Sequence, residues 1–134
     1  MFGEAIVIFN PALAQDLKYI RKQGMQLHSK MRFIGAQFDA LLSHDLWKRC
    51  AQHANEMAQK LQHELKKIPS IRITQPVEAN GIFAIMPAKM IQELQKAFFF
   101  YIWNDKTSEV RLMCSFDTTE EDVMKFSKRI QELA

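Results

Sequence analysis

The chain has 134 residues, of which 48% are hydrophobic and 25% charged, and its formal net charge is +3. This composition is typical of one globular domain with a core of its own, and the mixing of basic with acidic residues argues against nucleic acid as a partner. The longest apolar run, residues 97–103, is far shorter than the roughly 20 residues of a membrane helix. The chain also does not begin with the basic segment of a signal peptide. We therefore expect a cytoplasmic protein that binds no membrane.

The N-terminal residues predict a strand followed by a short helix. The apolar, β-branched run Glu4–Phe9 indicates a strand buried on both faces, although such a strand needs neighbours and no strand precedes it. Asn10 and Pro11 are residues preferred at a helix cap and at the first helical position, and Gly24 is typical of a helix end. We therefore expect a short helix between these two signals.

Two long helices are expected next. Over Leu27–Leu41 the apolar residues are spaced three and four apart, which is the pattern of one helix face. The pattern breaks at residues 43–45 and resumes over Trp47–Ile68, where Pro69 ends it. Both apolar stripes are interpreted as ordinary core.

After Pro69 the period of the apolar residues changes from about 3.6 to about 2, which indicates strands. The expected strands are 71–74, 81–86, 98–103 and 109–116. A helix beginning at Pro87 separates the second strand from the third, and the last helix is predicted to begin with a capping box of Thr118 and Glu121. This order predicts the α+β class: an antiparallel sheet of about four strands with helices on one face, preceded by two long helices.

Arg111 is the residue that points most directly to a binding site. In the strand predicted at 109–116, Val110 and Leu112 share one face and Arg111 projects from the other. A guanidinium group binds a carboxylate through two parallel hydrogen bonds, so this residue indicates an anionic substrate. The alternative is a surface arginine that lies over the edge of the sheet.

Other polar residues give weaker signals. Lys30 and Arg32 fall at the start of the second predicted helix, where basic side chains and free backbone N–H groups can bind a phosphate; a solvated first turn is the alternative. The four histidines and two cysteines lack the spacing of metal ligands, so we expect no metal, and Cys50 and Cys114 are interpreted as reduced core residues. The four glycines are too far apart for a glycine-rich phosphate loop.

Three segments carry a family resemblance. They read YIRKQGMQLHSKMRFIGAQFDALL at 19–42, QPVEANGIFAIMP at 75–87 and VRLMCSFDTTEEDV at 110–123. In this order they resemble the C-terminal half of the threonine aldolase and aromatic β-eliminating lyase family, whose members have fold type I and depend on pyridoxal phosphate. The resemblance implies that residues 27–134 are the small C-terminal domain with its connecting helices, and that residues 1–26 are a remnant of the large domain's strand and helix.

The resemblance also implies that the chain is catalytically incomplete by itself. The segment MFGEA resembles the residues that follow the family's Gly-Thr-Lys-Asn-Gly motif, whose lysine forms a Schiff base with the cofactor, and that motif is not present in the 134 residues. We therefore expect no catalytic residue in this chain, no covalent binding of pyridoxal phosphate by it, and inactivity of the isolated chain. The complete enzyme would cleave the Cα–Cβ bond of an amino acid or eliminate its β-substituent.

Individual positions follow from the same resemblance. Arg111 matches the family's arginine that binds the substrate's α-carboxylate, and Arg32 matches an arginine that reaches the cofactor phosphate, often that of a neighbouring subunit. Lys30 is a weaker candidate beside it. Asn80 lies near a loop that faces the active site in the family, with a simple turn residue as the alternative.

Two other interpretations stay open at this point. The chain could be a free-standing α+β binding or interaction module that kept the fold and lost the chemistry, or the small domain of an aminotransferase. Residues 114–116 (Cys-Ser-Phe) differ from the threonine and histidine common at this place in the family, so the substrate amino acid is open. The apolar faces of 4–9 and 27–42, which would pack on the rest of such an enzyme, predict a homo-oligomer, a dimer or larger.

Overall fold

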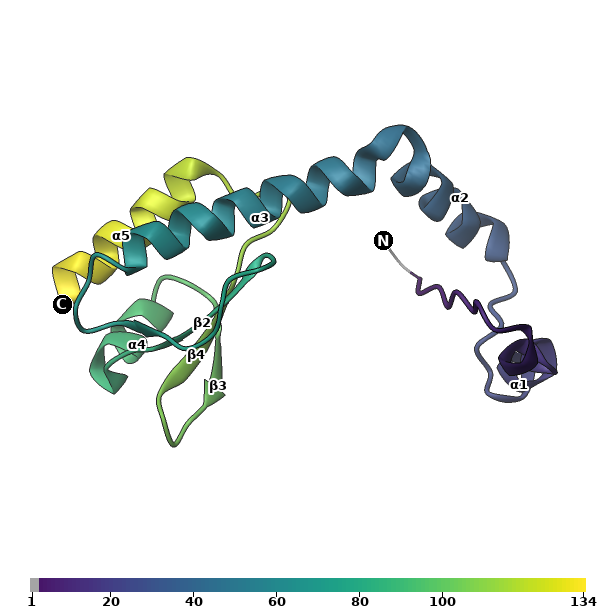
Figure 1. The fold of residues 1–134 in the computed structure, drawn as a ribbon, viewed down its shortest axis with the longest axis horizontal. Coiled ribbons are helices and arrows are strands. Elements are labelled where there is room, and N and C mark those ends of the chain that lie inside the picture. Colours follow the sequence, from purple (N-terminus) through teal and green to yellow (C-terminus); the bar gives the residue numbers. More distant parts are fainter. Residues whose placement is uncertain (1–2) are drawn as a thin grey trace. The chain divides into compact units, whose positions relative to one another are not determined.

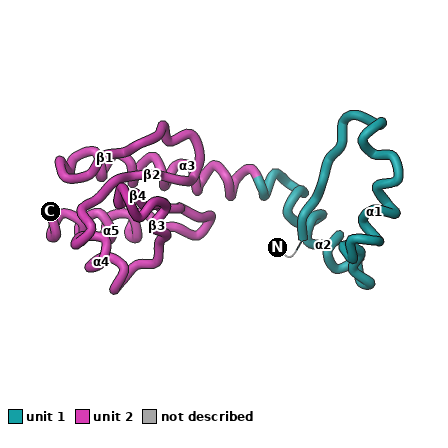
Figure 2. Tube along the Cα trace, turned by 90° about the horizontal axis from the view of Figure 1, so that it is seen from below, with its two compact units in different colours: residues 1–47 teal, residues 48–134 magenta. Residues whose placement is uncertain are grey.

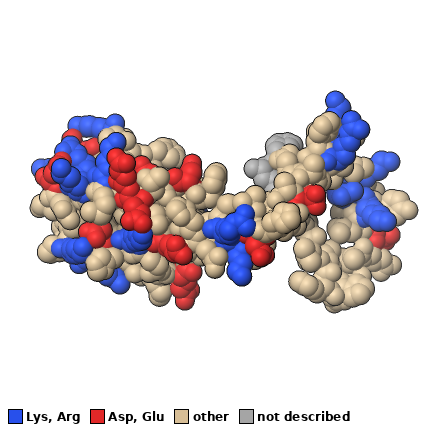
Figure 3. All heavy atoms as spheres, turned by 90° about the horizontal axis from the view of Figure 1, so that it is seen from above, with Lys and Arg blue, Asp and Glu red and all other residues tan. Residues whose placement is uncertain are grey.

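The computed structural model describes residues 3–134 and divides the chain into two compact units, residues 1–47 (unit 1) and 48–134 (unit 2), shown in Figure 2. The division at 26/27 that follows from the family resemblance concerns the origin of the segments and stays a prediction. Within the described residues, no helix combines the length and apolar character needed to cross a membrane. Basic and acidic side chains are intermixed over unit 2 in Figure 3, as their alternation along the sequence predicts.

Unit 1 begins with two short helical segments where the sequence predicted one. A 3-10 helix, η1 (Pro11–Ala14), is followed by α1 (Leu17–Gln23). The side chain of Asn10 accepts a hydrogen bond from a backbone N–H of η1 at 3.1 Å, which confirms the predicted cap. Asp16 separates the two segments because its φ of 57° is outside the helical region. Gly24 ends α1 as predicted, and its N–H donates to a carbonyl of the last turn.

The strand predicted at Glu4–Phe9 is wrong, because these residues have no regular secondary structure. Ile6, Val7 and Phe9 are 80%, 73% and 94% exposed, and no described segment pairs with them. A strand needs a neighbour for its backbone N–H and C=O groups. An apolar, β-branched run without such a partner therefore stays irregular.

The two long helices are present, with a shifted start for the first. They are α2 (Met31–Leu42) and α3 (Leu46–Leu65), so α2 begins four residues after the first apolar position of its stripe. The predicted break between them is a short 3-10 turn, η2 (Ser43–Asp45), in which His44 has a φ of 55°. One face of α3 is buried in unit 2 and consists of Ala54, Met57, Ala58, Leu61 and Leu65.

Unit 2 is an α+β domain, as predicted. Its elements after α3 are β1 (Arg72–Ile73), β2 (Gly81–Ile85), α4 (Ala88–Gln95), β3 (Tyr101–Asn104), β4 (Glu109–Met113) and α5 (Glu120–Leu133). The four strands form one antiparallel sheet in the order β1-β2-β4-β3. In Figure 1, α3 and α5 run side by side along one side of this sheet.

The alternation of side chains in the two central strands decides what each face of the sheet carries. Ile82 and Ala84 of β2 and Val110 and Leu112 of β4 are at most 4% exposed and belong to the core that packs under the helices. Residues at the intervening positions project to the opposite face, because side chains alternate along a strand. That open face carries Arg111, which the sequence had placed opposite the apolar face.

The capping box of α5 lies one residue later than predicted. The Thr119 hydroxyl accepts a hydrogen bond from the Asp122 N–H at 3.1 Å, and the Asp122 carboxylate accepts one from the Thr119 N–H at 2.9 Å. The predicted pair was Thr118 with Glu121. Thr118 is not the cap because its hydroxyl accepts from the N–H of Ser115 at 2.8 Å and so closes the preceding turn.

The carboxylates at the start of α5 predict an acid-sensitive contribution to stability. Hydrogen bonds from the side chain and backbone of Thr119 lower the pKa of Asp122, and the ammonium group of Lys60 lowers the pKa of Glu120 through a hydrogen bond and its charge. A lowered pKa in the folded state means that the stabilisation is complete above the ordinary carboxyl pKa of about 4 and is lost as the pH falls through the lowered value.

We therefore expect the free energy of unfolding to decrease as the pH falls below about 4 and Asp122→Asn to weaken this decrease. Urea denaturation followed by circular dichroism between about pH 7 and about pH 3 measures it. Glu121→Gln is the matched control, because it removes a charge from the same turn outside the capping box. An unchanged acid dependence in Asp122→Asn would contradict the prediction.

Candidate functional site

Arg111 lies in β4 on the open face of the sheet, between aromatic side chains. In the strand register it is the direct partner of Phe83 in β2 and of Tyr101 in β3. Directly opposed residues of antiparallel strands project to the same face, so both rings flank the arginine. The guanidinium carbon also lies 5.5 Å from the ring centroid of Trp103 in β3.

A second aromatic contact supports Trp103. Its ring meets the ring of Phe83 edge-on, with centroids 5.3 Å apart and planes at 75°. Aromatic pairs prefer this geometry, and a guanidinium group over an indole face is attracted by the ring quadrupole. Phe83, Trp103 and Arg111, from three adjacent strands, therefore form one stack that restricts the arginine side chain on one side.

Within residues 3–134, the guanidinium group of Arg111 has no acidic partner. Among the described residues it takes part in none of the ion pairs or hydrogen bonds. Glu109, two residues earlier on the same face, instead accepts a hydrogen bond from the hydroxyl of Thr74 at 2.5 Å. A guanidinium group carries five N–H donors in a planar fork, so Arg111 offers free donors to a carboxylate.

Lys30 and Arg32 lie at the first turn of α2, in unit 1. Lys30 is the residue before the helix and its side chain makes no cap hydrogen bond, its backbone N–H donates to Nδ1 of His28 at 3.1 Å, and both basic residues are exposed. The Arg32 guanidinium packs on the ring of Phe33 at 4.9 Å from its centroid, and neither Lys30 nor Arg32 forms an ion pair within residues 3–134. Two cations at a helix start match a phosphate in charge and donor type.

These positions form two separate candidate sites, one within each unit. Lys30 and Arg32 belong to unit 1 and Arg111 to unit 2, and each unit is a separate compact body. The residues of unit 1 fit the phosphate end of pyridoxal phosphate by their donors, and Arg111 fits a carboxylate. Their roles as cofactor and substrate ligands stay predictions.

Asn80 has a structural partner. Its side-chain amide donates to the Cys114 carbonyl at 2.7 Å, and the Cys114 N–H donates to the Asn80 carbonyl at 2.9 Å. These two bonds tie the end of β4 to the start of β2, which favours the turn interpretation of Asn80. Burial raises the pKa of the Cys114 thiol, so this cysteine is held as a neutral core residue.

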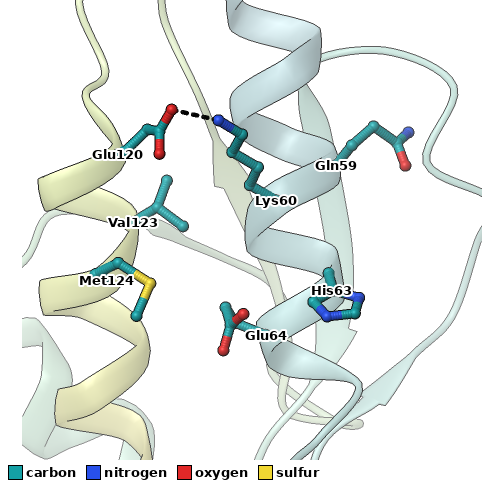
Figure 4. Close-up of a pocket in the computed structure, with 7 residues that line it drawn as sticks. All are labelled: Gln59, Lys60, His63, Glu64, Glu120, Val123 and Met124. Carbon is teal, nitrogen blue, oxygen red and sulfur yellow. Dashed lines mark hydrogen bonds and ion pairs between the residues drawn. The ribbon is translucent and has the colours of Figure 1, made fainter.

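The structure also has a surface depression of about 320 Å³ between α3 and α5 that the sequence did not reveal (Figure 4). An ion pair between Lys60 and Glu120 crosses it, and Val123 and Met124 line it from α5. Its residues come from two helices far apart in the chain, so no local spacing could have indicated it. It lies in the helical layer, whereas Arg111 lies on the opposite face of the sheet.

Unit 2 is thus an α+β domain with helices on one face of an antiparallel sheet and an unpaired arginine on the other. No family model matches the chain. The chain is 42% identical over 130 residues to the low-specificity L-threonine aldolase of Pseudomonas sp. strain NCIMB 10558 and 39% identical to that of Pseudomonas aeruginosa. Each match covers 96% of this chain, which spans 37% of the length of these curated relatives.

Solved structures give the same relationship. The threonine aldolase of Leishmania major superposes with a TM-score of 0.84 at 31% identity, over 94% of this chain and 37% of that chain. A glycine decarboxylase P-protein gives a TM-score of 0.62 at 19% identity, over 75% of this chain and 25% of that chain, which shows a likeness of fold alone. In sequence and in fold the chain is therefore similar to threonine aldolases, consistent with the C-terminal part of that family, and this confirms the predicted resemblance.

Proposed function

We propose that this chain is the C-terminal part of a cytoplasmic, pyridoxal phosphate-dependent lyase of the threonine aldolase type, and that the complete enzyme cleaves the Cα–Cβ bond of an amino acid or eliminates its β-substituent. The observation that carries the proposal is the unpaired Arg111 on the open sheet face. The 42% identity to a low-specificity L-threonine aldolase supports it.

In this proposal the residues of the chain bind and orient the substrate amino acid and the cofactor phosphate. The Arg111 guanidinium binds the α-carboxylate of the amino acid through two parallel hydrogen bonds, and the Trp103 ring limits the orientations that the guanidinium can take. A fixed carboxylate fixes the direction of the bonds at Cα, which selects the bond that breaks. Arg32 and Lys30 hold the cofactor phosphate. Pyridoxal phosphate, when bound, supplies an electron sink for the charge left at Cα.

The 134-residue chain alone is expected to be inactive. The Gly-Thr-Lys-Asn-Gly motif is absent from its sequence, so none of its lysines stands where the family binds the cofactor covalently. After addition of pyridoxal phosphate and reduction with borohydride, peptide mass spectrometry should show no single preferred lysine, and threonine should give no acetaldehyde. Labelling of one lysine together with turnover would contradict this expectation.

A chimeric enzyme tests the proposed activity. The region of the Pseudomonas aeruginosa aldolase that aligns with this chain is replaced by the chain, and glycine and acetaldehyde formed from L-threonine and other β-hydroxy amino acids are measured. We expect cofactor-dependent cleavage. The chimera carrying Arg111→Ala is the matched control. A folded chimera that binds the cofactor and cleaves none of these amino acids would contradict the proposal.

The alternative function is a free-standing binding module, and the closed core of unit 2 favours it, because the helices and the sheet bury a continuous apolar cluster within residues 57–130. Amino acid binding by the chain distinguishes the two. In a lyase fragment the affinity for glycine depends on Arg111, whereas an interaction module is insensitive to Arg111→Ala. The DNA upstream of Met1 gives a second test, because in-frame codons for Gly-Thr-Lys-Asn-Gly support the lyase.

We also propose that the chain forms homo-oligomers. Large apolar side chains of unit 1 are exposed: Ile6, Val7, Phe9, Leu13, Tyr19 and Met25, from 69% to 94%. Exposed apolar surface of this extent drives association. Sedimentation should show a dimer or larger, and Phe9→Ser with Leu13→Ser should shift it towards the monomer. Phe116→Ser, at an exposed aromatic position of unit 2, is the control. A concentration-independent monomer in the unaltered chain would contradict the proposal.

A further inference from the structure

The open face of β4 places opposite charges next to each other. Glu109 and Arg111 are two residues apart on the same face, which separates their backbones by about 7 Å along a strand. Side chains of this length can meet across that distance and form an ion pair. In the structure they do not, and each has a partner in another strand or loop.

The two partners lie on opposite sides of β4. In the strand order β1-β2-β4-β3, Trp103 of β3 contacts Arg111 from one side. Thr74, directly after β1, binds the carboxylate of Glu109 from the other side. The side chains of Arg111 and Glu109 therefore bind to partners on opposite sides of β4 and do not contact each other.

Hydrogen bonds fix Thr74 in a position from which its hydroxyl can hold the Glu109 carboxylate. Its backbone N–H donates to the Phe83 carbonyl at 3.0 Å, which continues the pairing of β1 with β2. Its hydroxyl lies 2.5 Å from the Glu109 carboxylate and 3.2 Å from the Phe83 carbonyl. A hydroxyl has one proton to donate, and the shorter contact to an ionised oxygen is the stronger hydrogen bond.

We propose that Thr74 is a positioning residue that keeps Arg111 available for an external carboxylate by holding Glu109 away from it. The proposal rests on the proposed function, in which Arg111 binds the substrate carboxylate. Without the Thr74 hydroxyl, Glu109 pairs with Arg111 and competes with the ligand. Both side chains are partly accessible to solvent, and a solvent-accessible pair contributes little stability, so we expect about a two- to fivefold loss of carboxylate affinity.

Nuclear magnetic resonance of the arginine Nε–H groups tests this in the full chain labelled with nitrogen-15 arginine. The chain has six arginines, and the Arg111 signal is assigned by its loss in Arg111→Lys. Acetate is the probe. Thr74→Val keeps the β-branched shape, moves the Arg111 signal in the absence of ligand, and raises the Kd for acetate about two- to fivefold. The double variant Thr74→Val with Glu109→Gln should return both the position of the Arg111 signal and the Kd for acetate towards the values of the unaltered chain.

The control is Thr107→Val, which removes an exposed hydroxyl in the turn between β3 and β4 and should change neither readout. An unchanged Arg111 signal and Kd in Thr74→Val, or no recovery in the double variant, would overturn the role of Thr74. A failure of the unaltered chain to bind acetate at Arg111 would contradict the carboxylate role of Arg111 instead, and the signals without ligand still show whether Glu109 moves onto the arginine.

Discussion

Replacing Arg111 with alanine is expected to abolish saturable binding of glycine to the chain and to lower kcat/KM of the aldolase chimera by about 10²- to 10³-fold. The reason is that the α-carboxylate loses its charged partner on the open face, where no described acidic residue competes for Arg111 and no other described basic residue contacts the Trp103 ring. The loss should appear mainly as an increase in KM, because the interaction with the carboxylate is present before and during bond cleavage.

Two variants sharpen this test. Arg111→Lys keeps the charge and loses the planar fork, so its affinity should lie between those of the unaltered chain and Arg111→Ala. Arg72→Ala removes an exposed arginine from the edge strand β1 and should leave glycine binding within about twofold, since exposed charges that lie apart interact weakly. Glycine affinity that survives Arg111→Ala would remove the main support for the lyase assignment.

The second large effect concerns the core of unit 2. Leu65 of α3 and Leu94 of α4 are fully buried in the apolar cluster under the sheet. Substitution of either by alanine leaves a cavity and should lower the free energy of unfolding by about 2–5 kcal/mol. Urea denaturation followed by circular dichroism measures the change, with the denaturant dependence used to check that the folded state is retained.

An exposed leucine provides the matched control. Leu13 is 71% exposed in unit 1, so Leu13→Ala should change the free energy of unfolding by less than about 0.5 kcal/mol at a dilution where sedimentation shows the monomer. Equal effects of Leu13→Ala and Leu65→Ala would mean that the apolar side chains of unit 1 are as deeply buried in solution as the core of unit 2.

Local signals in the sequence were sufficient for most elements. Apolar periodicity predicted α2, α3 and α5, and Pro87 directly precedes the start of α4. The predicted end of α3 at Pro69 is late, because the helix ends at Leu65. These signals work because a helix forms its hydrogen bonds within the segment and its buried face follows from residue spacing. The cap of α5 was missed by one residue because Thr118 and Thr119 are chemically equivalent in the sequence, and the turn at Ser115 uses the first of them.

Pairing between distant segments was not predictable in the same way. The apolar run Glu4–Phe9 has the composition of a strand, but composition does not state whether a neighbouring strand exists. The environment of Arg111 depends on the order β1-β2-β4-β3, which brings Phe83 and Trp103 to Arg111 and Thr74 to the neighbouring Glu109. The alternation of side chains along each strand predicted the face of the sheet to which each residue projects. It did not predict which residues of the adjacent strands lie beside it.

By itself the sequence determined the α+β class, the face of β4 from which Arg111 projects, and the family to which these motifs point. Only the tertiary structure decided that Arg111 packs on Trp103, that Glu109 is bound to Thr74, and that no acidic side chain among the described residues pairs with the arginine. The physical reason is that side-chain direction follows from the local backbone period, whereas a side chain's partners follow from strand order and register, which the whole domain sets.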